Sequence, residues 1–218
     1  MKKIYGMVAL WIFSQAAFSE TFYTVCKKLE NQLNSESREG EGSYIRSFRI
    51  LRKATGFTDC YQAHNVLLHT SELNLGDTEM DNLRPLGSLP APGSLVSLDL
   101  SNTEVSDLTP LSHLISLRQL FLFNTNVSEA ETLSHMSWLS VLDLGETMVA
   151  DISFLQRNSM LTWLNLGSSQ VTSVRPLAFS SRLTYLDVSD CEIHDIQSLK
   201  ALSSLRINTD ASVILESE

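Results

Sequence analysis

Hydrophobic residues recur every 22 positions over the central and C-terminal parts of the chain. Five columns carry this period: Leu95, Leu117, Leu139, Leu161, Leu183 and Leu205; Leu98, Leu120, Leu142, Leu164 and Leu186; Leu100, Leu122, Leu144, Leu166 and Val188; Val105, Val127, Val149, Val171 and Ile193; Leu111, Leu133, Leu155, Leu177 and Leu199. A single unit of this length cannot bury its own apolar face. Consecutive units are therefore expected to stack into one continuous core.

Two shorter periods predict the structure within each unit. Leu98 and Leu100 alternate with exposed positions, which is typical of a short strand. After the strand, apolar residues fall at every third position, as at Val105, Leu108 and Leu111, which favours 3₁₀-like turns over an α-helix. We therefore predict an α/β solenoid: a curved array with short parallel strands on its concave side and 3₁₀-like turns on its convex side.

Residues 20–69 lack the repeat and carry apolar residues at helical spacing. We expect one helix around Cys26, a second with Ser43 as its N-cap, and a third that begins at Thr58 or Asp59. A helical N-terminal cap would cover the leucines and the open strand edge of the first repeat.

The two ends of the chain have different expected roles. Residues 1–19 combine Lys2 and Lys3 with an apolar run and a small-residue site, which predicts a signal peptide. A retained membrane anchor needs roughly 20 apolar residues, and this run is shorter. The repeats are expected over 70–207, with the last one shortened to a spacing of 19. The tail, 208–218, is expected to fold over the last repeat or to mediate self-pairing.

The charge balance narrows the class of partner. The 218 residues carry a formal net charge of −9, and removing residues 1–19 would make it more negative. Nucleic acid and anionic membrane are therefore poor partners, because both require a basic face. No other stretch is apolar enough to predict a membrane span, and the sequence favours no particular oligomeric state.

Three cysteines in an exported chain suggest one disulfide and one buried thiol. Cys26 and Cys60 share the non-repeating segment, and their pairing would close a loop of about 35 residues. Cys191 belongs to a repeat column and is expected to be inert and buried. His113 and His135 share a column without a third ligand, so we expect two solvated side chains rather than a metal site, and no cofactor.

The unit LVSLDLSNTEVSDLTPLSHLIS, residues 95–116, resembles the 22-residue leucine-rich repeat of bacterial internalin-type proteins. Residues 20–69 also resemble the cysteine-bearing cap of exported proteins in this group. The resemblance implies an exported protein, in the periplasm, at the cell surface or secreted, that binds rather than catalyses. One column departs from the usual Asn in the turn after the strand; it contains Thr78, Thr103, Thr125, Thr147, Ser169 and Cys191. A hydroxyl can still satisfy a buried backbone group there.

Nothing in the chain resembles a catalytic motif, so we predict a non-enzymatic module that binds a protein or peptide of basic character. The residues expected to bind the partner are those of the strand columns that face away from the core: the apolar Phe121, Phe123, Val141, Trp163 and Tyr185 and the acidic Asp99, Asp143 and Asp187. Exposed aromatic clusters commonly mark contact sites. Three alternatives stay open: aromatics that only stabilise neighbouring strands, a structural envelope component without a specific ligand, and an enzyme with scattered catalytic residues.

Overall fold

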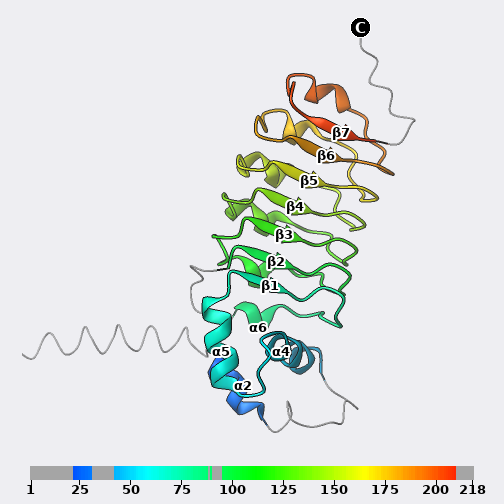
Figure 1. Cartoon of the computed structure of the whole chain (residues 1–218). Helices are drawn as coiled ribbons and strands as arrows, with labels where there is room; N and C mark the ends of the chain where they lie inside the picture. The colour runs from blue at the N-terminus through cyan, green and yellow to red at the C-terminus, as the bar shows by residue number, and fades with distance from the viewer. Residues whose placement is uncertain (1–21, 31–41, 88, 90–94, 210–218) are drawn as a thin grey trace, which may run out of the picture.

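Seven short strands form one parallel sheet in which each strand pairs with the next one along the chain. The computed structural model describes residues 22–30, 42–87, 89 and 95–209. In Figure 1 the strands stack in order above the helices of the cap. They are β1 (Glu72–Asn74), β2 (Ser97–Asp99), β3 (Gln119–Phe121), β4 (Val141–Asp143), β5 (Trp163–Asn165), β6 (Tyr185–Asp187) and β7 (Arg206–Asn208). The predicted solenoid is therefore confirmed.

The register of the sheet follows the repeat. Leu98 pairs with Leu120, and Leu120 with Leu142, at the predicted spacing of 22. These leucines are fully buried, whereas the residues on either side of each one face out of the core. At the end of the array Leu186 pairs with Ile207, a spacing of 21. The predicted spacing of 19 was wrong, because the last coil lacks one residue rather than three.

The side opposite the strands consists of short turns. Five are 3₁₀ helices: η1 (Thr109–Leu111), η2 (Glu131–His135), η3 (Ser153–Arg157), η4 (Arg175–Leu177) and η5 (Ile196–Leu199). The first repeat instead forms one turn of α-helix, α6 (Arg84–Gly87), in which Gly87 N donates to Leu83 O. The spacing of 25 between β1 and β2 gives this coil three more residues than the others and therefore room for the wider turn.

The turn after each of the strands β1 to β6 contains one non-glycine residue with a positive φ, between 51° and 56°. These residues are Asp77, Asn102, Asn124, Glu146, Ser168 and Asp190. Asn and Asp tolerate this conformation better than other non-glycine residues. The neighbouring hydroxyl column does what was expected: Thr103 Oγ1 donates to Leu100 O at 2.6 Å, and Thr147 Oγ1 to Leu144 O at 2.7 Å.

Cys191 occupies the same column but is partly exposed, not buried as expected. Its thiol donates to Leu166 O at 3.0 Å and lies 3.7 Å from Ser169 Oγ. The described residues cover this side chain from one side only, because the next position of the column falls outside them.

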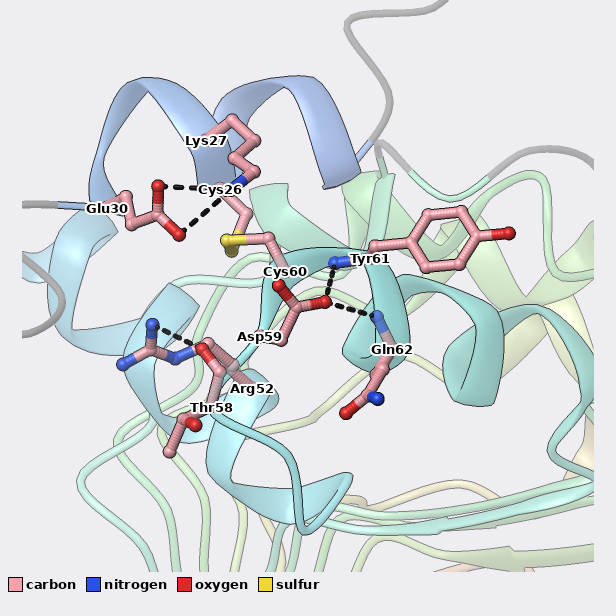
Figure 2. Close-up of polar contacts among 9 residues, drawn as sticks. All are labelled: Cys26, Lys27, Glu30, Arg52, Thr58, Asp59, Cys60, Tyr61 and Gln62. Carbon is pink, nitrogen blue, oxygen red and sulfur yellow. Dashed lines mark hydrogen bonds and ion pairs between the residues drawn. A yellow bond between two sulfur atoms is a disulfide. The ribbon is translucent and has the colours of Figure 1, made fainter.

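Three helices form the described part of the cap: α2 (Phe22–Lys28), α4 (Ser43–Ala54) and α5 (Cys60–His69). A disulfide joins Cys26 of α2 to Cys60 of α5, as expected (Figure 2). The rings of Phe22 and Phe48 stack with centroids 4.7 Å apart, which ties α2 to α4. None of the helices in the described part of the chain has the length and apolar character needed to cross a membrane.

The N-caps of α4 and α5 differ from one another. Asp59 accepts from the backbone N–H groups of Tyr61 and Gln62 and is the N-cap of α5, at one of the two positions where this helix was expected to begin (Figure 2). Ser43 was expected to cap α4 but is its first helical residue, and Gly42 is the N-cap. The Ser43 hydroxyl instead donates to Asp81 Oδ1 at 2.8 Å, a contact with the first repeat that local sequence could not show.

The predicted signal peptide, 1–19, lies outside the described residues. So does most of the predicted tail, of which Asn208 and Thr209 are described. Asn208 is the last residue of β7, and its backbone carbonyl accepts from Val188 N.

Candidate functional site

The side chains of the sheet that point away from the core form a surface that we call the strand face. On this surface the predicted site residues lie in adjacent rows. Val141, Trp163 and Tyr185 are successive Cα partners on β4, β5 and β6. Phe121 of β3 pairs with Asp143 of β4. Because neighbouring strands lie about 4.8 Å apart, these side chains occupy one continuous surface.

The aromatic side chains are not one fully exposed cluster. Trp163 and Tyr185 stack with ring centroids 5.5 Å apart and an interplanar angle of 7°. Phe121 and Phe123 lie two strands away, and no ring contact among the described residues joins them to Trp163. All four side chains are partly buried. The expectation of full exposure was therefore wrong, since each ring covers part of its neighbour or of the backbone beside it.

Phe123 lies against a glycine of the next coil. A Cβ on Gly145 would come within 3.0 Å of Phe123 Cδ2 and within 2.6 Å of Asn165 Nδ2. Gly145 and Gly167 are both buried, and Gly167 lies close to Asn165, Asp187 and Ser189. The absence of a side chain at Gly145 thus positions Phe123 and Asn165, and neither glycine was recognised from sequence as part of the site.

The acidic column contributes to the fold as well as to the surface charge. Asp99, Asp143 and Asp187 each use Oδ1 to accept from the backbone N–H two residues ahead, at 2.9 to 3.0 Å. Asn165 does the same for Gly167 and also donates from Nδ2 to Asp143 Oδ1. Short polar side chains are favoured here because they satisfy the turn that follows the strand.

The pKa values of two of these carboxyl groups, Asp143 and Asp187, are shifted in opposite directions. Burial raises the pKa of Asp143, helped by the charges of Asp187 and Asp99 and opposed by hydrogen bonds from Gly145 and Asn165. Burial also acts to raise the pKa of Asp187, but hydrogen bonds from Ser189, Asn208 and Tyr185 outweigh it and lower that pKa. Burial and the neighbouring Asp187 raise the pKa of the Tyr185 hydroxyl.

Metal chemistry finds no support in the geometry. No group of three or more His, Cys, Asp or Glu side chains that could hold a metal ion occurs among residues 22–30, 42–87, 89 and 95–209. His135 is solvated as expected, but His113 is partly buried. Burial lowers the pKa of His113, against a hydrogen bond with Pro110 that raises it.

A second concavity lies where the cap meets the first repeat. It measures about 430 Å³ and is lined by α4 and by the turn after β1. Arg46 and Lys53 line its α4 side, and Asp77 and Glu79 line the other side. Because cations and acids face each other across this groove, it shows no single charge preference, and we do not include it in the binding site.

Several internalins of known structure resemble the chain. It superimposes on an internalin (InlF) from Listeria monocytogenes with a TM-score of 0.54 and 22% identity over 66% of this chain and 48% of that one. Internalin C2 from the same species gives a TM-score of 0.52 and 21% identity over 73% of this chain and 90% of that one. A functional domain of InlJ from Listeria monocytogenes, described as including a cysteine ladder, gives a TM-score of 0.52 and 19% identity over 64% of this chain and 29% of that one.

The chain spans about half the length of the InlF structure. No protein-family model and no curated protein matches its sequence. At these identities the similarity shows the fold, an internalin-like leucine-rich repeat array.

Proposed function

We propose that this chain is an exported, non-catalytic module that binds a protein or peptide on the concave face of its repeats. The stacked pair of Trp163 and Tyr185 on the strand face carries the proposal. Stacked rings present a large, rigid apolar area whose ordering costs little entropy when a partner binds. Phe121, Phe123 and Val141 extend this area across β3 and β4.

The proposed partner is basic with apolar side chains. Asp99, Asp143 and Asp187 share one row of the sheet with Phe121, beside the row of Trp163 and Tyr185, which gives the face an acidic character. Such charges chiefly steer association and discriminate between partners, whereas buried aromatics supply affinity. The hydrogen bonds of these carboxylates hold them in fixed positions, so they add little flexibility to the site.

Two observations support export. The Cys26–Cys60 disulfide suits an oxidising compartment such as the periplasm or the extracellular space. Residues 1–19 have the composition of a signal peptide. We expect a chain fractionated from its native cells to be found outside the cytoplasm without these residues.

The binding proposal is tested by selecting ligands from a displayed peptide library on the immobilised protein. We expect selected peptides to be basic and apolar, and Trp163→Ala or Phe121→Ala to weaken their binding by about 2 kcal/mol. Tyr61→Ala in the cap is the matched control, because Tyr61 is 59% exposed and far along the chain from the strand face. Equal losses in all three variants would contradict a concave site. Failure to select any saturable ligand would favour a structural envelope component.

A further inference from the structure

Charges in the repeat array are segregated by position within the coil, except at the first position of the 3₁₀ turn, which is Glu131 in η2 and Arg175 in η4. Between residues 95 and 209, every Lys and Arg lies between the start of a 3₁₀ turn and the first residue of the next strand: Arg118, Arg157, Arg175, Arg182, Lys200 and Arg206. Every Asp and Glu lies between the last residue of a strand and the start of the following turn: Asp99, Glu104, Asp107, Glu129, Glu131, Asp143, Glu146, Asp151, Asp187, Asp190, Glu192 and Asp195.

This segregation places opposite charges on opposite flanks of the sheet. We call the residues that precede each strand the amino flank and those that follow it, up to the turn, the carboxyl flank. On the amino flank, Arg118 N donates to Val96 O, and Ser140 N to Arg118 O, both at 2.8 Å. On the carboxyl flank, Asn102 N donates to Phe123 O and Glu146 N to Gly167 O, both at 2.8 Å. Both flanks are therefore stacked in register, coil upon coil.

The amino flank also carries the most exposed large apolar side chains of the array. Phe179 is 95% exposed, Ile115 55% and Trp138 53%. The Arg118 guanidinium lies 5.8 Å from the centre of the Trp138 ring. Exposed aromatic side chains beside arginines are the composition of a protein interface, not of an ordinary solvated surface.

Column spacing aligns these residues along the amino flank. Arg182 lies two coils from Trp138 in the same column, at a spacing of 44, and Arg157 is one coil from Phe179 at a spacing of 22. Arg118, Arg157 and Arg182 are all exposed. The strand face is a separate surface, because its aromatic residues lie within β3, β5 and β6 or immediately after β3.

We propose that the amino flank of one molecule binds the carboxyl flank of a second copy, with the two solenoids side by side and their axes parallel. The two flanks have opposite charge, and their charges repeat at the same spacing because both belong to the same coils. Cations on one copy can therefore meet acids on the other over several coils at once. Exposed Met148, at 46%, gives the carboxyl flank an apolar contact of its own.

This contact is heterologous, because it joins two different surfaces. Each copy keeps one amino and one carboxyl flank available, so association continues into rows of molecules rather than stopping at a closed dimer. Asp99, Asp143 and Asp187 lie within the strands and not on the carboxyl flank, so the concave faces remain open in such a row. The inference is thus independent of the partner proposed for the strand face.

Charge reversal with mutual rescue tests the proposal. One variant carries Arg118→Glu, Arg157→Glu and Arg182→Glu; the other carries Glu104→Lys, Glu129→Lys and Glu192→Lys. All six side chains are exposed, so both variants should keep the circular dichroism and Tm of the unchanged protein. Sedimentation velocity is then measured on the purified proteins from micromolar to near-millimolar concentration.

We expect the unchanged protein to form concentration-dependent oligomers and each variant alone to associate at least tenfold more weakly, because its three reversed charges face like charges on the other flank. An equimolar mixture should associate more strongly than either variant alone, because the Glu residues introduced on the amino flank of one variant can pair with the Lys residues introduced on the carboxyl flank of the other, and the two unaltered flanks also match. Trp138→Ser with Phe179→Ser should weaken self-association about tenfold or more, and Tyr61→Ser in the cap should not.

Three outcomes would overturn the proposal. The first is an unchanged protein that stays monomeric throughout the concentration range, which would leave the amino flank to an acidic partner of another kind. The second is unaltered self-association of either charge-reversed variant. The third is a mixture of the two variants that remains monomeric.

Discussion

Single residues of the strand face serve both the fold and the candidate site. Asp143 shows this most clearly, because its carboxyl group holds the turn at Gly145 and accepts from Asn165 while lying in the row beside the aromatic residues. Thr147, in contrast, has only a structural role. Its buried hydroxyl donates a hydrogen bond to Leu144 O, which would otherwise be buried without a donor. A substitution on this face therefore has to be assessed for stability before its effect on binding is interpreted.

Asp143→Asn should stabilise the protein at neutral pH. The raised pKa of Asp143 means that its neutral form is favoured on folding, so the stability it contributes is present at low pH and is lost as pH rises through the folded pKa. An amide keeps the acceptor oxygen without the charge. We expect a gain of a few tenths of a kcal/mol in urea unfolding at pH 7, shrinking toward zero below about pH 4.

Asp187→Asn is the matched control with the opposite sign. Its lowered pKa means that the carboxylate contributes stability above its unfolded pKa, and that this contribution is lost as pH falls. The free energy of unfolding of the Asp187→Asn variant should be lower by about 1 kcal/mol at pH 7. If both substitutions changed the free energy of unfolding at pH 7 in the same direction, the opposite pKa shifts of Asp143 and Asp187 would be contradicted.

At the scale of elements, the cap depends on one covalent link and on aromatic packing. The disulfide holds the short helix α2 against α5, and Phe22 packs on Phe48 of α4. An isolated helix of this length is unstable in water. The cap in turn contacts the first repeat, where Asp81 accepts from Ser43 and Ser47 and pairs with Arg46 at 3.4 Å.

Removing the disulfide by Cys26→Ser with Cys60→Ser should cost about 3 to 4 kcal/mol of unfolding free energy, since the bond closes a long loop in the unfolded chain. Thermal unfolding followed by circular dichroism measures the loss. Cys191→Ser is the control and should leave Tm nearly unchanged, because this free thiol is partly exposed. Finding both Cys26 and Cys60 as free thiols by mass spectrometry of the non-reduced protein would refute the link.

At the scale of the whole molecule, stability is shared between neighbouring coils, because each repeat contacts mainly the one before and the one after it. Central coils are covered on both sides, and their strand leucines are fully buried. At the C-terminal end, Leu202, Leu205 and Ile207 are only partly buried. The array should therefore open from this end first.

Leu142→Ala in β4 should cost about 3 kcal/mol, whereas Ile207→Ala in β7 should cost about 1 kcal/mol, because less of Ile207 is buried. Hydrogen exchange followed by mass spectrometry should show the least protection at β7 and the most at β3 to β5. Equal protection along the whole array would indicate that the end is stabilised by further contacts.

The sequence by itself determined the repeat, the strands and the buried columns. A 22-residue period of leucines leaves one way to bury every apolar side chain, and that requirement is local and recurs in each unit. Sequence patterns also placed the start of the third helix at Thr58 or Asp59 and identified the residues that face outward on the strands. The sequence also indicated the disulfide, because Cys26 and Cys60 share the one segment without repeats.

Only the tertiary structure decided which contacts the outward-facing side chains make. Trp163 and Tyr185 stack on each other, Phe123 lies on Gly145, and Asp143 is held by Asn165 of the next coil. Each of these contacts joins residues about 22 apart. Their geometry depends on the separation and twist between coils, and the order of residues along the chain does not encode that distance. For the same reason, Ser43 was mistaken for a cap when its hydroxyl reaches Asp81 in the first repeat.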